Sequence, residues 1–358
     1  MGKTSRIYHY HVNIVFKGTG VSNKIGKVTS GYAGSINYQD TFVFFTKSCN
    51  IVMSRTKNYA DGTILSNASN TINSQIVKAL LCYYAVAKDF PVVDRISIIR
   101  KQSGKPDYVY KESSTVSQPI LGGALRSSMC NSVVVKGLME DSQRGLAMRN
   151  AMSYWLKGIA SNDAYYRFEH IWRAFNGLFM FHGNHPKEFE CMRTMRQLIL
   201  DNAGSFPRSI SITNGYTRDE LHAFRWVRMI LNDYETRAKN QALVDFVCRY
   251  HDGRIMEMLR EKLACRRKFL KDDPKKLDVV VDNHINSNTG TRNDVELVTL
   301  LSIKYSYFVR NKIFHGEIAD GTFKLMPNNI DHEITCLNNL LETLVLELMD
   351  NYHLLRNV

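Results

Sequence analysis

The sequence has no long apolar run and no paired cysteines, and these absences exclude several classes of protein. No stretch of the 358 residues approaches the roughly eighteen uncharged apolar residues of a transmembrane helix. The N-terminal segment is basic but lacks an apolar core and a small-residue cleavage site, so no secretory signal peptide is expected. The seven cysteines are scattered and never spaced as CxxC, which favours reduced thiols in the cytoplasm over a zinc ribbon or a disulfide scaffold.

The sequence also lacks the short motifs with which several common chemistries begin. It has no Walker loop, no GxGxxG fingerprint and no GxSxG nucleophile elbow, so triphosphate, dinucleotide and serine-hydrolase sites have no starting residue. His9 and His11 share a strand face, and His182 and His185 end a helix, but neither pair has a carboxylate or cysteine cluster beside it. Because metal sites group several donors, these are expected to be ordinary imidazoles, and no metal or cofactor is expected.

Basic residues are in excess, and the excess is unevenly placed. Forty-seven Lys and Arg against thirty-four Asp and Glu give a formal net charge of +13 and a pI of about 9.3. Residues 1–115 hold fifteen basic and six acidic side chains, a net charge of +9, whereas the remaining residues hold thirty-two and twenty-eight, a net charge of +4. This distribution favours a polyanionic partner for the N-terminal third, and the alternative is ordinary charge for solubility.

The N-terminal third has the pattern of a small α+β domain. Residues 6–16 alternate and are rich in β-formers, and residues 41–56 predict one or two more strands. Residues 74–90 have helical spacing and stop before a proline, and residues 95–102 are again strand-like. This order predicts one helix packed on a sheet.

Glycine, serine and proline become frequent at 103–128, which is typical of a boundary between domains. The sequence therefore predicts a basic α+β domain over residues 1–115, with a role in RNA binding or sensing. A linker region over 116–144 and a second domain over 145–358 follow it.

The second domain is predicted to be helical throughout. Four segments have amphipathic helical spacing: 162–183, 219–251, 293–311 and 332–355. The first is expected to begin at Asn162 or Asp163 as its N-cap and to close at Gly183. The expected fold class is thus an α+β N-terminal domain followed by an all-α helical bundle, mostly α overall.

A basic segment at 260–276 contains eight basic and three acidic residues. It can follow a phosphate backbone, or it can be a solvated helix end that runs into a loop at Pro274. On the first interpretation the candidate RNA-binding side chains are Arg266, Arg267 and Lys268, together with Lys312 from a later segment.

That later segment, VRNKIFHGEI at 309–318, is the strongest candidate site. Arg310 and His315 are five residues apart, Asn311 follows the arginine and a glycine follows the histidine. Arg-x4-His alone occurs by chance, as at Arg6 and His11 within a predicted strand. The later copy differs because it closes one apolar helix and precedes another.

These residues resemble a known family. RNKIFHG is similar to the RNxxxHG signature of HEPN domains, helical bundles found in many metal-independent ribonucleases of prokaryotic defence and toxin systems. RFEHIWRAFNGLF, at 167–179, resembles the WxALExLF helix of the abortive-infection (ApeA-like) branch, with Asn176 in place of the usual Glu. The resemblance covers about residues 145–357, and the N-terminal domain resembles no family.

The resemblance implies cleavage of RNA, with transfer RNA as one candidate substrate, by attack of a ribose 2′-OH on the adjacent phosphorus. This step needs a proton acceptor, a proton donor and a cation for the developing charge. His315 can serve either proton role, Arg310 presents a planar fork to phosphate oxygens, and Asn311 can donate to a phosphate or orient the histidine. In the family two motifs meet across a dimer interface, so one motif per chain implies a homodimer with a composite site.

The sequence is also compatible with other interpretations. The segment can be an ordinary helix end, with Arg310 capping carbonyls and Gly316 as the glycine after the C-cap. The chain can be a non-catalytic RNA-binding or scaffold protein, as some family members are. It can also be the toxin of a toxin–antitoxin pair, although such toxins are usually little more than the bundle. The sequence names no activating signal, phage trigger or regulatory partner.

Overall fold

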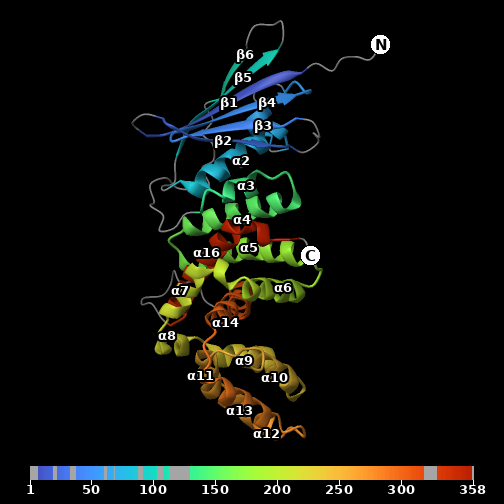
Figure 1. Cartoon of the computed structure of the whole chain (residues 1–358), viewed down its shortest axis with the longest axis vertical. Helices are drawn as coiled ribbons and strands as arrows, with labels where there is room; N and C mark the ends of the chain where they lie inside the picture. Colours follow the sequence, from blue (N-terminus) through green and yellow to red (C-terminus); the bar gives the residue numbers. More distant parts are fainter. Residues whose placement is uncertain are drawn as a thin grey trace, which may run out of the picture. The chain divides into compact units, whose positions relative to one another are not determined.

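The computed structural model describes residues 7–18, 22–32, 38–59, 63–67, 69–87, 92–102, 108–112, 130–317 and 329–356. The chain divides into two compact units (Figure 1). The first consists of Met1–Ala160 with Leu348–Val358, and the second is Ser161–Glu347. Within the described ranges, no helix is both long and apolar enough to cross a bilayer.

The first unit is built on a six-stranded antiparallel sheet of order β2-β3-β4-β1-β5-β6. Its strands are β1 Tyr8–Phe16, β2 Lys24–Ser30, β3 Asp40–Phe45, β4 Ser48–Arg55, β5 Val93–Gln102 and β6 Tyr108–Glu112. The helices of this unit are α1 Thr63–Ser66, α2 Thr71–Val86, α3 Val134–Met139 and α4 Gln143–Ile159.

Period-two burial along β1 explains why the sheet has one covered face. Tyr10, Val12, Ile14 and Phe16 are buried, while the residues between them are exposed or half-buried. The ring of Phe16 stacks on Tyr83 of α2 with 4.0 Å between the centroids. The strands predicted at 6–16, 41–56 and 95–102 and the helix at 74–90 are therefore confirmed, with β2 and β6 in addition.

A buried ion pair joins three elements of this unit. Asp40 at the start of β3 accepts from both terminal nitrogens of Arg55 at 2.8 and 2.6 Å. Gln75 of α2 donates to the same carboxylate at 2.7 Å. Because every one of these side chains is buried, their hydrogen bonds fix how α2 lies on the sheet.

The predicted boundary is wrong in its position. The first unit extends to Ala160, so α3 lies inside the predicted linker of 116–144 and α4 crosses the predicted start of the second domain at 145. The apolar side chains of Val134, Leu138 and Trp155 are buried, and Ser30 donates to the carbonyl of Met139 at 2.5 Å. The boundary is therefore set by the packing of α3 and α4 on α2, and not by the turn-rich composition of the preceding segment. Residues 116–129 of the predicted linker lie outside the described ranges.

The described residues of the second unit form helices joined by short turns, with no strand among them. Its helices are α5 Ala164–Gly183, α6 Glu188–Asp201, α7 Pro207–Gly215, α8 Arg218–Ala223, α9 Trp226–Tyr234, α10 Asn240–Val247, α11 Gly253–Lys262, α12 Arg267–Lys271, α13 Leu277–Asn288, α14 Asp294–Thr299, α15 Ser306–Phe314 and α16 Asn329–Asp350, which enters the first unit at its end. The predicted fold class, an α+β start followed by helices and mostly α overall, is confirmed.

Helix ends show where the sequence signals were sufficient. Asp163 caps α5 by accepting from the backbone N–H of Tyr166 at 2.6 Å, as predicted. Gly183 is the last helical residue, and the left-handed residue after it is Asn184, with φ of +42°. The helix predicted at 219–251 is wrong as one piece, because the chain breaks into α8, α9 and α10.

Candidate active site and adjoining pocket

The RNKIFHG segment lies on the last turns of α15, and an irregular helix leads into it. Residues Leu300–Tyr305 form a π-helix between α14 and α15. Ser306 donates its hydroxyl to the carbonyl of Leu301 at 2.8 Å, so this backbone carbonyl of the wider turn has a hydrogen-bond partner. π-Helical turns are rare in proteins, and those that occur are often found at functional sites.

Helix α5 supports α15 through an aromatic cluster. Trp172 is buried and lies 6.2 Å from Tyr307 of α15, centroid to centroid. On α5 it packs edge-on against Phe175 and Phe179 at 5.8 and 6.0 Å. The tryptophan helix and the RNKIFHG helix, which are far apart in the sequence, therefore pack together, while Asn176 donates to Glu188 of α6 at 2.9 Å.

Two of the predicted site residues contact each other directly. Arg310 donates from Nη1 to Oδ1 of Asn311 at 2.8 Å, and its guanidinium carbon lies 4.6 Å from the ring centroid of Phe314. Its Nε is buried and has no hydrogen-bond partner among the described residues. The alternative interpretation expected Arg310 to cap the carbonyls at the helix end, and among the described residues it makes no such bond.

His315 ends the helix and is exposed to solvent. Gly316 follows it with φ of +67°, donating to the carbonyl of Ile313 at 3.0 Å, while Glu317 donates to that of Lys312 at 3.0 Å. This pair of bonds is a Schellman motif, which satisfies carbonyls at the helix end and favours glycine. Gly316 is therefore the glycine after the C-cap, as expected, and the turn holds His315 at the C-terminal end of α15.

The motif is divided between two faces of α15. Residues spaced i, i+3, i+4 and i+7 lie on one face of a helix, so Phe308, Asn311, Lys312 and His315 share a face. Arg310 is five residues from His315, which places the two about 140° apart around the axis. One copy of the motif therefore presents its arginine and its histidine to different sides.

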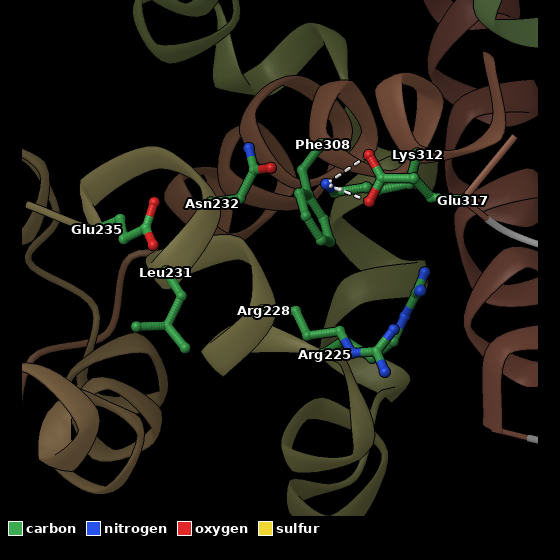
Figure 2. Close-up of a pocket in the computed structure, with 8 residues that line it drawn as sticks. All are labelled: Arg225, Arg228, Leu231, Asn232, Glu235, Phe308, Lys312 and Glu317. Atoms are coloured by element: carbon green, nitrogen blue, oxygen red, sulfur yellow. Dashed lines mark hydrogen bonds and ion pairs between the residues drawn. The ribbon is translucent and has the colours of Figure 1, made fainter. Parts of the chain in front are cut away.

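A pocket of about 380 Å³ lies along the face that carries Lys312 (Figure 2). Its lining comes from α9 with the two residues that flank it, from α15 and from the turn after α15: Arg225, Arg228, Leu231, Asn232, Glu235, Phe308, Lys312 and Glu317. Lys312 donates to both carboxylate oxygens of Glu317 at 2.8 and 2.7 Å. The pocket thus combines three cations, two carboxylates, an amide and two apolar side chains.

A buried network fixes the wall that α9 contributes. Arg225 donates to both oxygens of Glu333 at 3.0 and 2.7 Å, and its backbone N–H donates to the hydroxyl of Tyr305 at 2.7 Å. Burial and the Glu333 carboxylate raise the pKa of Tyr305 well above its ordinary value, so this phenol stays neutral. The bond from Arg225 to Tyr305 thereby connects the last residue of the π-helix to the residue that precedes α9.

The basic segment at 260–276 is only partly exposed. Arg266 is fully buried, with Nη2 donating to the carbonyl of Thr236 at 2.9 Å and to Asn240 at 2.8 Å. The expectation that Arg266 contacts RNA is therefore wrong, because its side chain ties the α9–α10 turn. Arg267 pairs with Asp282 at 2.5 Å, and Lys268 is exposed.

The other histidine pairs have ordinary contacts. His9 shares a hydrogen bond with the hydroxyl of Ser54 at 3.0 Å, and His185 accepts from the backbone N–H of Lys187 at 3.1 Å. Throughout the described ranges, no three His, Cys, Asp or Glu side chains gather in a metal-binding group. Arg6, which forms the second Arg-x4-His match, lies outside the described residues.

Sequence reasoning missed the α9 side of the pocket. The only signal was the three-residue spacing of Arg225 and Arg228 within the segment 219–251, which was predicted to be one helix. The break before Trp226 turns this face toward α15, and nothing in the local pattern shows that break.

Comparisons with protein-family models, curated proteins and solved structures found no match to this chain. The chemistry of the site is therefore the basis for assigning a function.

Proposed function

We propose that this chain is a metal-independent endoribonuclease of the HEPN type. The observation that carries the proposal is the arrangement of RNKIFHG at the end of α15. Arg310 and Asn311 are hydrogen-bonded to each other, and His315 is exposed on the face that also lines the pocket. This set supplies a cation, an amide and a proton-transfer group, and the amide and His315 share the face of α15 that carries the pocket-lining Phe308 and Lys312.

The proposed reaction uses the RNA itself as nucleophile. His315 accepts the proton of a ribose 2′-OH, and the 2′-oxygen attacks the adjacent phosphorus while the bond from phosphorus to the 5′-oxygen breaks. A second acid gives a proton to the departing 5′-oxygen. The products are a 2′,3′-cyclic phosphate and a 5′-OH end, and no bond in this balance requires a metal ion.

Arg310 and Asn311 have distinct tasks in this reaction. The guanidinium stays charged at every relevant pH and can bind two oxygens of the phosphorane at once. The amide of Asn311 holds the guanidinium from one side and thereby reduces the number of orientations available to it. Preorganised donors of this kind stabilise the transition state more than the substrate.

The geometry of α15 favours a homodimer. With Arg310 and His315 about 140° apart on one helix, a two-fold arrangement of two chains can bring the arginine of one copy to the histidine of the other. Each site of such a dimer takes its cation from one chain and its proton acceptor from the other, and a water molecule protonates the leaving oxygen.

We place this activity in the cytoplasm, as a defence or toxin-type effector that cuts cellular or phage RNA, with transfer RNA as one candidate. None of the seven cysteines forms a disulfide, which fits a reducing compartment. The basic N-terminal unit is proposed to capture or orient RNA while the helical unit cuts it.

The test is an RNA cleavage assay in EDTA, with chemical identification of the new ends. Cyclic or 3′-phosphate and 5′-OH ends in the absence of divalent metal are expected. Complete loss of cutting in EDTA, restored by magnesium, would reject this mechanism.

A further inference from the structure

The pocket beside α15 has two chemically different ends. Arg225 and Arg228 approach it from the start of α9, whereas Asn232 and Glu235 line it at the other end of that helix, on the opposite side in Figure 2. The seven residues from Arg228 to Glu235 correspond to about 10 Å along a helix axis. That separation matches the length of a nucleotide from its phosphate to the far edge of its base.

The cationic end has a charge ready for an anion. Arg225 is held by Glu333 and is 13% exposed, so its role is to form a fixed wall. Arg228 is exposed and has no hydrogen-bond or ion-pair partner among the described residues. Lys312 is paired with Glu317, whose side chain is 52% exposed and can move aside for a phosphate. An anion at this end would therefore meet Arg228 first.

The opposite end is suited to a base that donates hydrogen bonds. Glu235 accepts no side-chain hydrogen bond from a described residue, and its own carbonyl accepts from Arg266, which fixes the turn that carries it. A carboxylate can accept two parallel N–H bonds. Guanine presents two adjacent N–H donors on its Watson–Crick edge, whereas the other bases present one donor beside acceptors.

Apolar side chains lie between the two ends. Leu231 is 39% exposed and offers its side chain to the pocket, and Phe308 is 2% exposed and forms part of the floor. A volume of about 380 Å³ lies near the lower end of the range for ligand pockets, which suits one unstacked nucleotide and not a helical stretch.

We propose that this pocket binds one guanine nucleotide of single-stranded RNA, with its phosphate at Arg228 and Lys312 and its base edge at Glu235. The proposal rests on the proposed ribonuclease function, because this nucleotide is the neighbour of the bond presented to His315. The ribonuclease would then prefer to cut next to an unpaired guanine.

The first experiment measures binding without cleavage. The full chain is titrated calorimetrically with GMP, AMP, CMP and UMP up to millimolar concentration. GMP is expected to bind about tenfold tighter than the others, within the roughly 5- to 150-fold discrimination typical of a bidentate base contact. Equal affinity for the four nucleotides, or no binding by any, would overturn the proposal.

Two variants assign the ends of the pocket. Glu235→Gln is expected to remove the preference for GMP and leave AMP binding unchanged, and Arg228→Ala is expected to weaken all four monophosphates. The controls are Glu257→Gln and Arg193→Ala, residues of α11 and α6 with side chains 44% and 74% exposed that do not line the pocket. A preference for GMP that survives Glu235→Gln would contradict the assignment of the base edge.

The second experiment separates RNA from a free nucleotide and the pocket from the nuclease. In a His315→Ala background, a guanine-containing oligoribonucleotide is expected to compete with GMP, and a guanine-free one is not. Competition by neither would show a free-nucleotide site and overturn the RNA proposal. Guanine-selective binding by a wild-type chain that never cuts RNA would uphold the pocket and reject the nuclease. Cutting without base preference would do the reverse.

Discussion

His315 transfers the proton in the proposed reaction, so its removal has the largest expected effect. His315→Ala should lower the single-turnover cleavage rate by about 10²–10⁴, the range for loss of a general acid–base group. Because His315 is exposed and its backbone makes the helix-ending bond, the variant should keep its fold and its melting temperature.

His11→Ala is the matched control, since His11 belongs to the second Arg-x4-His match and lies in β1 of the other unit. Its cleavage rate should equal that of the wild type. If His315→Ala cuts normally while His11→Ala does not, the catalytic residues lie in the N-terminal unit.

Glu317 is expected to compete with RNA for Lys312. The pair is 2.7 Å apart and partly solvated, and exposed pairs of this kind contribute about 0.2–1 kcal/mol. Glu317→Gln frees the ammonium group and should tighten binding of short RNA up to about fivefold, as measured by fluorescence anisotropy.

Glu257→Gln is the control for this effect, because Glu257 pairs with Arg218 at 2.9 Å on another surface. Equal tightening in both variants would show a general charge effect and not the release of Lys312.

Single residues were predicted only where the chemistry is local. Arg310, Asn311 and His315 could be selected because spacing and residue type are visible in the sequence, although their reactivity is a proposal. Arg266 was misplaced because a basic run gives no sign of which member turns inward to bind carbonyls. Arg228 and Glu235 were missed because the pocket needs α9 and α15 together, and that pairing is a tertiary contact.

Among the elements, strand β2 carries two of the basic side chains that give the N-terminal unit its positive charge. It lies at one edge of the sheet, and Lys24 and Lys27 on it are exposed. If they contact RNA, the double variant Lys24→Ala/Lys27→Ala should reduce the slope of log affinity against log salt by about 0.7 for each lost phosphate contact.

Lysines on an edge strand also prevent strand-to-strand association between molecules. The salt series is therefore paired with light scattering. An unchanged slope with increased aggregation would assign these lysines to edge protection and would contradict their role in RNA binding.

Elements with strong periodicity were predicted well, and interrupted ones were not. The stripe of α5 and its Asp163 cap are local signals, so the helix was found almost to the residue. β2 was missed because its sequence, KIGKVTS, carries a glycine and two lysines, and its strand form depends on pairing with β3. The π-helix at 300–305 was likewise missed, because residue type in this apolar segment does not distinguish i→i+5 from i→i+4 bonding.

At the scale of the whole molecule, the order of an α+β part and a helical part was predictable and the boundary was not. Composition marks 103–128 as turn-rich, but α3 and α4 beyond it bury their apolar faces on α2. The segment Leu348–Val358 also belongs to the first unit, which no local pattern indicates. Long-range packing of this kind has no signature in a single sequence.

The proposed dimer makes a quantitative prediction that a single-chain site does not. Arg310→Ala and His315→Ala chains, each inactive alone, are mixed in equal amounts and allowed to exchange subunits. If a site takes Arg310 from one copy and His315 from the other, each mixed dimer holds one intact site and one doubly altered site.

Half of the dimers are then mixed, so the mixture should regain about a quarter of the wild-type activity, as the two-fold symmetry requires. Sizing at micromolar concentration should show a dimer for the wild type and both variants, which establishes that exchange partners are present. If each chain holds a complete site, mixing restores nothing. A dimer that regains no activity after exchange would therefore reject the composite site, and full activity from a monomer would reject the dimer itself.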